Sequence, residues 1–196
     1  DWLERYGSTL IKTQGREKEG MDLCKAAAEK GHLSAWYHVA NAYKTGKFVQ
    51  KDWAYAMACC EKGLADKESI GCANVAGEML FYGGDGVPQD YARAVQLFGQ
   101  AHALGNNWGN DMAGTCYLFG YGCQRDPARA RTLFEEAKYT SDLKNYGLGL
   151  IYADGLGVPE DIKKGVEYLQ KAPQYAPAQE ALLRFKKTLF GKWVRR

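Results

Sequence analysis

Four aspartates recur at nearly even spacing in this chain, each at the end of a glycine-containing segment, and this repetition most constrains its fold. The aspartates are Asp52, Asp90, Asp126 and Asp161, which lie 38, 36 and 35 residues apart. A small residue, alanine or glycine, follows each of them four positions later. Repetition at a period of about 36 residues indicates a stack of similar units rather than one domain around a single core.

Each unit is predicted to form two helices joined by a glycine-containing turn. Apolar and small residues recur at helical spacing before the glycines, as over 143–153, and after the aspartate, as over 91–103. The aspartate suits the N-cap of the second helix, because its carboxylate accepts N–H groups of the first turn. Pro127 fits the first helical position after Asp126. Since one such helix pair cannot bury its apolar side alone, we expect neighbouring pairs to stack.

A degenerate copy over 26–32 extends the series to about five repeats. Their predicted limits are 1–32, 33–68, 69–107, 108–142 and 143–178. Pro173 and Pro177 then break the pattern. Apolar residues mix with lysines and arginines over 179–196, which predicts a capping helix and a basic tail, because the end of a repeat stack needs a cover. The alternative is an amphipathic basic helix that binds an acidic membrane or a partner.

The repeated residues resemble the core of the Sel1-like repeat, a relative of the tetratricopeptide repeat. In the last copy the matching residues are Leu148, Gly149, Tyr152, Gly155, Gly157, Val158, Asp161 and Lys164. The copy that ends at Asp126 matches in the same register, from Gly114 to Arg129. The resemblance implies an all-α fold, a right-handed α-α superhelix with a concave groove. It also implies a role as a scaffold or adaptor that binds other proteins.

In such stacks the first helix of each repeat lines the concave groove, so its polar and aromatic side chains are the candidate contacts for a protein or peptide partner. These candidates, expected to be exposed or half-exposed, are Trp36, Tyr37, His38, Asn41, Asn74, Glu78, Asn110, Asp111, Thr115, Phe119, Asn145 and Tyr146. Asparagine offers both donors and acceptors to a peptide backbone, and aromatic side chains are frequent hot spots of binding. The alternative is that most of the aromatics pack between helices and most of the asparagines are solvated or serve as caps.

Composition narrows the classes of function. The 26 basic and 23 acidic residues give a net charge of +3, too balanced to suggest nucleic-acid binding. No uncharged apolar run approaches the roughly 18 residues of a membrane-spanning helix. We expect a cytoplasmic protein, with a secreted or periplasmic location as the alternative, because the chain begins at Asp1 and a signal peptide would precede it. A monomer or a complex with a different protein is favoured.

The six cysteines are predicted to be small buried residues of a reduced protein. Some secreted Sel1-like proteins staple each helix pair with a disulfide, and their cysteines recur in register. Here Cys72 matches one such position, but Leu64 occupies its partner position, and the other cysteines do not recur in register. The three histidines are scattered, and no Cys-x-x-Cys pair occurs. We therefore predict neither a metal site nor a cofactor.

Two short motifs resemble those of penicillin-recognising enzymes: Ser141 to Lys144 has the form S-x-x-K, and Lys44 to Gly46 reads K-T-G. Their order along the chain is reversed, and Ser141 is better interpreted as an N-cap between repeats. The sequence therefore predicts a non-enzymatic protein that binds other proteins. A narrower hypothesis is a bacterial immunity protein that neutralises a toxin or effector. A β-lactam-binding or hydrolase-like secreted protein is the alternative from another class.

Overall fold

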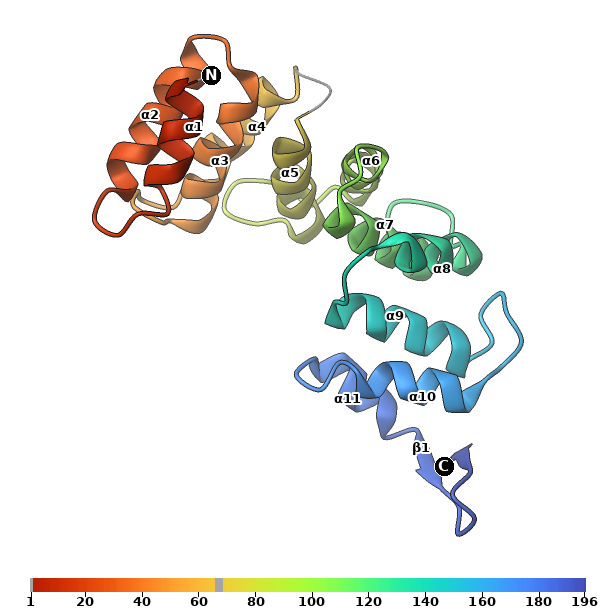
Figure 1. The fold of residues 1–196 in the computed structure, drawn as a ribbon. Helices are drawn as coiled ribbons and strands as arrows, with labels where there is room; N and C mark the ends of the chain where they lie inside the picture. Colours follow the sequence, from red (N-terminus) through yellow and green to blue (C-terminus); the bar gives the residue numbers. More distant parts are fainter. Residues whose placement is uncertain (1, 66–68) are drawn as a thin grey trace. The chain divides into compact units, whose positions relative to one another are not determined.

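The computed structural model describes residues 2–65 and 69–196, which form two compact units (Figure 1). Unit 1 extends to Asn106, and unit 2 runs from Asn107 to Arg196. The division falls next to the predicted border between the third and fourth repeats. The predicted border at residue 68 and the first residue of the chain lie outside the described residues.

Unit 1 consists of three helix pairs, and the two helices of each pair are neighbours in sequence. Its elements are α1 (Trp2–Leu10), α2 (Glu17–Glu29), the 3-10 helix η1 (Leu33–Ala35), α3 (Trp36–Thr45), α4 (Trp53–Gly63), α5 (Ile70–Tyr82) and α6 (Tyr91–Ala103). Contacts between α2 and α3, α3 and α5, and α4 and α5 join the pairs into a stack.

Unit 2 continues the pattern with two helix pairs, followed by a short helix and a β-hairpin. Its elements are α7 (Asn107–Phe119), α8 (Pro127–Glu136), α9 (Asp142–Ala153), α10 (Ile162–Gln170), α11 (Ala176–Leu182), β1 (Phe185–Lys187) and β2 (Trp193–Arg195). Here α7 packs on α9, and α9 packs on α11, so the first helices of successive repeats lie side by side.

The four recurring aspartates cap the second helices, as the sequence predicts. Each carboxylate accepts the backbone N–H three residues later, at 2.8–2.9 Å. Pro127 is the first residue of α8, where its missing N–H costs nothing. Gly157, in the turn before α10, has a φ of +71°, a left-handed conformation that favours glycine.

The aspartates also fix the length of each turn through their own backbone. In three of the four turns the N–H of the capping aspartate donates to the C=O nine residues earlier, at 2.8–2.9 Å. Asp90 donates to the C=O of Leu80, ten residues earlier, at 2.8 Å. Gly84 and Val87 exchange two hydrogen bonds, of 2.8 and 2.9 Å, inside this longer turn. One extra residue is thus absorbed in the turn, and α6 keeps its place.

A buried phenylalanine of the second helix packs against glycine of the first helix in two successive repeats. The Phe98 ring lies against Gly77, and the Phe134 ring lies against Gly114 of its own repeat and Gly147 of the next. A Cβ at Gly114 would come within 2.8 Å of the Phe134 ring. The rings are fully buried, so these glycines set how closely the helices approach.

The segment 179–196 does not form the predicted capping helix. Helix α11 ends at Leu182, and the chain then turns into an antiparallel hairpin in which Phe185 pairs with Arg195. Phe185 is buried in the core of unit 2, and Trp193 packs against the same core. The helical prediction was wrong because Phe185 and Trp193 pack on the core of unit 2 from two paired strands, and Gly191 allows the turn between them with a φ of +77°.

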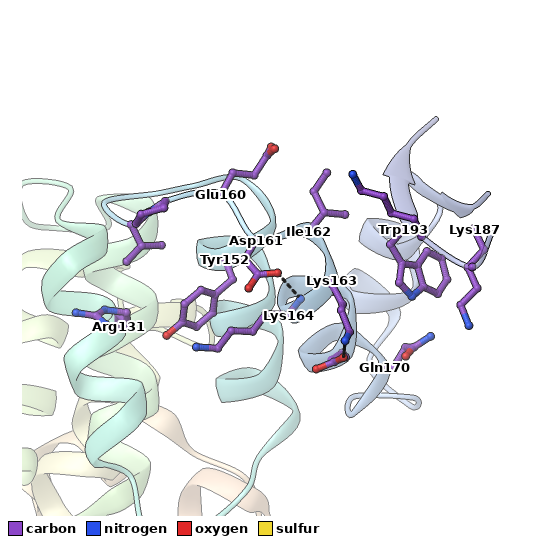
Figure 2. A pocket seen from close by; sticks show the side chains of 15 residues that line it. Arg131, Tyr152, Glu160, Asp161, Ile162, Lys163, Lys164, Gln170, Lys187 and Trp193 are labelled. Carbon is purple, nitrogen blue, oxygen red and sulfur yellow. Dashed lines mark hydrogen bonds and ion pairs between the residues drawn. The ribbon is translucent and has the colours of Figure 1, made fainter. Parts of the chain in front are cut away.

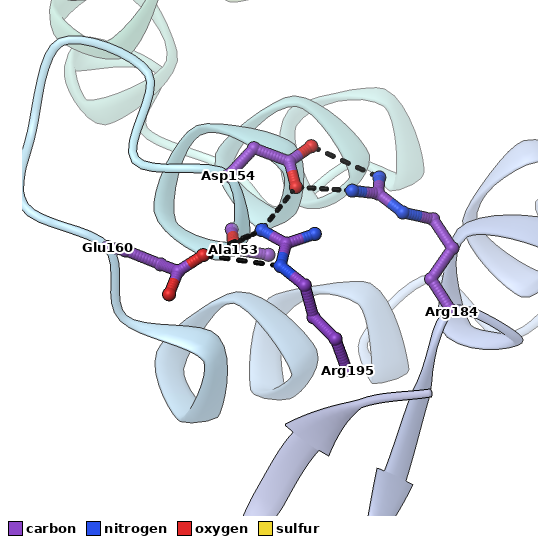
Figure 3. A network of polar contacts seen from close by, with 5 residues as sticks. All are labelled: Ala153, Asp154, Glu160, Arg184 and Arg195. Carbon is purple, nitrogen blue, oxygen red and sulfur yellow. Dashed lines mark hydrogen bonds and ion pairs between the residues drawn. The ribbon is translucent and has the colours of Figure 1, made fainter.

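Two arginines hold the hairpin on the end of α9 (Figure 3). Arg184 and Arg195 both donate to the carboxylate of Asp154, and Arg195 also reaches Glu160 at 2.7 Å and the C=O of Ala153 at 2.6 Å. Burial raises the pKa of Asp154, but the hydrogen bonds from the two arginines outweigh it and hold this pKa below its usual range. The hairpin is therefore a fixed part of unit 2.

Five of the six cysteines are buried, as predicted, whereas Cys123 is half-buried, and all six carry free thiols. Burial raises the pKa of Cys116 to about 12 and that of Cys24 to about 11. These thiols therefore stay protonated and weakly nucleophilic. In the described part of the chain, no three histidine, cysteine or acidic side chains gather as metal ligands. Among residues 2–65 and 69–196, no helix has the length and apolar character to cross a membrane.

Candidate functional site

The first helices of unit 2 present a row of aromatic side chains, the aromatic face. It consists of Phe119, Tyr121, Tyr146 and Tyr175. The Phe119 ring lies 5.7 Å from Tyr121 and 6.4 Å from Tyr146, measured between centroids. Tyr146 in turn meets Tyr175 edge-to-face at 5.3 Å. Phe119 is 40% exposed, and the other three rings are exposed or half-buried, so the face combines rigid packing with surface access.

A cavity of about 540 Å³ lies beside the aromatic face, between α9 and α11. Its apolar lining includes Tyr146, Leu150 and Leu183, and its charged lining is Glu180 and Arg184. Burial, together with the neighbouring Tyr175 hydroxyl and the Glu180 carboxylate, raises the pKa of Tyr146, so its hydroxyl stays protonated at neutral pH. The site therefore offers apolar surface, one carboxylate, one guanidinium and a hydroxyl that can donate.

Two of the predicted contact residues, Phe119 and Tyr146, lie together in this face. Sequence reasoning missed Tyr121 and Tyr175. Tyr121 follows the turn glycine Gly120, and Tyr175 lies between two prolines, so neither belongs to a predicted first helix. The available signal for Tyr121 was its position two residues after Phe119, and the sequence carried no comparable signal for Tyr175.

Five of the twelve candidates are buried, so the expectation that they would be exposed was wrong. They are Trp36, Asn110, Asp111, Thr115 and Asn145. Trp36 is only 5% exposed and lies under the Lys62 ammonium, which is 4.6 Å from the ring centroid. The error has one cause: a first helix packs against its own partner helix and against an adjacent repeat of the same unit, which leaves a narrow exposed strip.

The buried polar candidates join one helix to another. The Asn145 amide donates to the C=O of Lys171, at the end of α10, at 3.2 Å. Asp111 accepts a hydrogen bond of 2.5 Å from the Ser141 hydroxyl, which ties α7 to the start of α9. Thr115 donates to the C=O of Asp111 at 2.8 Å, within α7. These contacts satisfy part of the hydrogen-bonding capacity of the buried groups, and Asp111 Oδ1 is left without a partner among the residues that the structure describes.

Ser141 is the N-cap of α9, as predicted. Its Oγ accepts the N–H of Lys144 at 3.0 Å while its hydroxyl donates to Asp111. The Lys144 ammonium donates to the C=O of Ala137 at 2.6 Å. The lysine of the other motif, Lys44, forms an ion pair with Glu78 inside unit 1. Ser141, Lys144 and Lys44, three polar residues of the two penicillin-like motifs, thus each make a contact within the fold.

The remaining candidates lie in unit 1 and are half-buried. His38 and Asn41 line a small pocket of about 90 Å³ together with Phe48. Burial lowers the pKa of His38, so its imidazole is neutral at pH 7. Tyr37 packs over Gly71, and its ring lies 5.0 Å from that of His38. Asn74, on α5, is likewise half-buried. These residues do not form an extended aromatic row like that of unit 2.

A second, larger cavity of about 1040 Å³ lies between α10 and the hairpin (Figure 2). Its lining is rich in cations, which are Arg131, Lys163, Lys164, Lys187 and Lys192. Lys164 lies over the Tyr152 ring, 3.7 Å from the centroid, and Trp193 closes the hairpin side. The acidic lining residues are Glu160, Asp161 and Glu167, and Asp161 among them caps α10. This surface is formed mainly by α10, the turn before it and the hairpin, so it was not among the contacts predicted on the first helices.

The Sel1 repeat family model matches residues 69–106, 110–139 and 145–172, which are the third to fifth predicted repeats. The chain is a Sel1-like repeat protein. Its helical repeat fold is confirmed by two solved structures. A protective antigen of uropathogenic Escherichia coli strains that displays an SLR fold aligns with a TM-score of 0.76 and 26% identity, over 92% of this chain and 40% of that one. A Sel1 repeat protein from Oxalobacter formigenes aligns with a TM-score of 0.73 and 21% identity, over 91% of this chain and 75% of that one.

Among curated proteins, this Sel1-like repeat protein is 30% identical over 162 residues to the ERAD-associated E3 ubiquitin-protein ligase component HRD3B of Arabidopsis thaliana. The match covers 82% of this chain and 20% of that protein, so the chain spans about a fifth of its curated relative. Sel1 repeat proteins generally mediate interactions between proteins.

Proposed function

We propose that this Sel1-like repeat protein binds a protein or peptide through the aromatic face of unit 2. The observation that carries the proposal is the continuous row of Phe119, Tyr121, Tyr146 and Tyr175 beside a cavity of about 540 Å³. Rigid tyrosine and phenylalanine rings provide large contact area at low entropic cost. A surface of this kind, held by neighbouring helices, favours recognition of a partner chain.

The cavity favours a segment that presents one apolar side chain between polar groups. An aliphatic side chain can fill the space lined by Leu150 and Leu183. Glu180 at the same cavity can then pair with an amine or with backbone N–H groups of the segment, whereas the Arg184 guanidinium is already held by Asp154. The Tyr146 hydroxyl adds a donor near the centre. The chemistry fits a peptide with mixed apolar and charged character.

The relatives support binding over catalysis. A ubiquitin-ligase component works within a protein assembly, and the match to HRD3B extends over most of this chain. Toxin neutralisation would be a special case of the same binding. A β-lactam reaction finds no support at Ser141, whose oxygen caps α9 and whose hydroxyl is held by Asp111.

The test compares a variant of the aromatic face with a matched aromatic control. Phe119→Ala/Tyr121→Ala removes two exposed rings, and Tyr82→Ala removes a 60% exposed ring from α5 in unit 1. Partners captured from the native cell by the unaltered chain are identified by mass spectrometry and then measured by calorimetry. We expect the dissociation constant to rise at least about tenfold for the double variant and to stay unchanged for the control.

Circular dichroism checks that both variants keep the helical fold. A partner that binds the double variant as tightly as the unaltered chain would contradict the proposal. Trp36 and Asn110 are unsuitable for this test, because both side chains are buried and their loss would destabilise the repeats.

A further inference from the structure

The tip of the C-terminal hairpin exposes two large apolar side chains next to each other. Leu189 and Phe190 are 102% and 98% exposed, as exposed as such residues are in an extended chain. They lie between β1 and β2, where the N–H of Thr188 donates to the C=O of Lys192 at 2.8 Å. Turns are usually polar, because solvent surrounds them. A leucine and a phenylalanine here therefore need a reason beyond folding.

Cations surround this apolar tip. The segment 184–196 contains six basic residues and no acidic residue. Arg184 and Arg195 are used to hold the hairpin on α9 (Figure 3). The basic residues nearest to the tip are Lys186, Lys187 and Lys192. All three are exposed, and Lys187 and Lys192 also line the cation-rich cavity.

The hairpin is held firmly enough to present its tip at a defined place. Phe185 is only 2% exposed and belongs to the core of unit 2. The Lys187 ammonium lies 5.4 Å from the Trp193 ring centroid, which joins the two strands next to the turn. Figure 1 shows the hairpin at the end of unit 2, beyond α11. The apolar tip is thus a fixed protrusion and not a loose end.

We propose that this hairpin docks on an anionic membrane surface. Leu189 and Phe190 enter the boundary between headgroups and acyl chains, and Lys186, Lys187 and Lys192 contact the lipid phosphates and carboxylates. A protruding tip with a collar of one charge sign matches a surface that is apolar inside and negative outside. Stable attachment to a membrane needs two signals, and the hairpin supplies both an apolar and an electrostatic one.

The test is flotation of the purified chain with vesicles that contain phosphatidylserine and with vesicles of phosphatidylcholine alone. We expect binding to the first kind only, and weaker binding as the salt concentration rises. Leu189→Ser/Phe190→Ser should lower the partition coefficient at least about tenfold. Trp2→Ser is the matched control, because Trp2 is 67% exposed and lies in unit 1.

A second pair of variants separates charge at the hairpin from net charge. Lys186→Glu/Lys192→Glu should lower the partition coefficient, whereas Lys18→Glu/Lys30→Glu, with the same charge change on exposed residues of unit 1, should change it far less. Failure of the unaltered chain to float with phosphatidylserine vesicles would overturn the proposal. It would also be overturned if the tip variant floated normally but lost a bound protein. Phe119→Ala/Tyr121→Ala should float normally, which keeps this proposal separate from the proposed function.

Discussion

Asp111 is a buried carboxylate whose burial costs free energy and whose hydrogen bond to Ser141 joins two helices. Its side chain is 1% exposed and joins α7 to the N-terminus of α9 through Ser141. Burial raises its pKa, and the Ser141 hydroxyl and the Lys144 ammonium offset only part of this effect. A buried carboxylate is thus retained where it orients a cap, although its charge is costly.

This balance predicts an unusual pH dependence of stability. Because the folded chain raises the pKa of Asp111 above the ordinary value of about 3.9, the folded state binds this proton more tightly than the unfolded state. Its contribution to stability is therefore full below the unfolded pKa and is lost as the pH rises through the folded pKa. We therefore compare the free energy of unfolding of the unaltered chain with that of Asp111→Asn. The difference should favour the unaltered chain more at acidic pH than at neutral pH.

Urea unfolding of both chains over this pH range measures the effect. The same replacement at Asp22, which is exposed on α2, is the control. A difference between the unaltered chain and Asp111→Asn that stays constant with pH would show that burial does not penalise the carboxylate.

Gly157 gives a second prediction at the scale of one residue. Its φ of +71° places any side chain in a strained conformation, most of all a β-branched one. Gly157→Val should lower the free energy of unfolding by about 2–3 kcal/mol. Gly99→Ala, in the middle of α6 with open space around it, should raise it by about 0.5–1 kcal/mol. Chemical denaturation compares the two, and equal stabilities would refute the left-handed turn at Gly157.

At the scale of one element, an aspartate N-cap marks where the second helices α4, α6, α8 and α10 begin. The Asp126 carboxylate accepts the N–H of Arg129 at 2.9 Å, whereas the hydrogen bonds of Asp126 with Tyr117 and Ala130 involve only its backbone. Asp126→Ala should therefore cost about 1 kcal/mol of unfolding free energy. Asp22→Ala removes an exposed carboxylate from within α2 and should cost much less. Thermal unfolding followed by circular dichroism measures both, and equal losses would argue against a capping role.

The helix pairs were predictable because their signals are local. A capping aspartate, a turn glycine and apolar residues at helical spacing lie within one repeat, and each agrees with the others. The hairpin was not predictable in this way. Its conformation depends on Phe185 entering a core built by α9 and α10, and on Asp154, 30 residues before Arg184. Long-range packing overrode the apparent helical pattern there.

The candidate site was only partly predictable for a related reason. Sequence places a residue on the first helix but does not tell which strip of that helix the neighbours cover. Phe119 and Tyr146 lie on the exposed strip, whereas Asn110 and Asn145 are buried. Asn145, a predicted partner contact, instead donates to the C=O of Lys171 at the end of α10.

At the scale of the whole molecule, helix pairs contact their sequence neighbours within each of the two units, so the loss of one core side chain should destabilise only the helices around it. Phe134 is fully buried within unit 2, and Phe134→Ala should cost about 3–5 kcal/mol. Hydrogen exchange should then show lost protection in α7, α8 and α9, with α1 to α4 unchanged. Phe98→Ala should instead affect α5 and α6. Equal loss of protection along the whole chain, in either variant, would mean that the array unfolds as one cooperative unit.

Because Phe134 contacts glycines of two repeats, one repeat of this chain cannot be moved alone into another protein without losing part of this packing. Any side chain at Gly114 or Gly147 would meet this ring, and a smaller residue at 134 would leave a cavity between the two glycines. The sizes of the three residues can therefore change only together. A repeat cut from this chain at the turn before α9 would keep Gly114 and Phe134 but lose Gly147. The transferable module is thus one helix pair together with the first helix of the next.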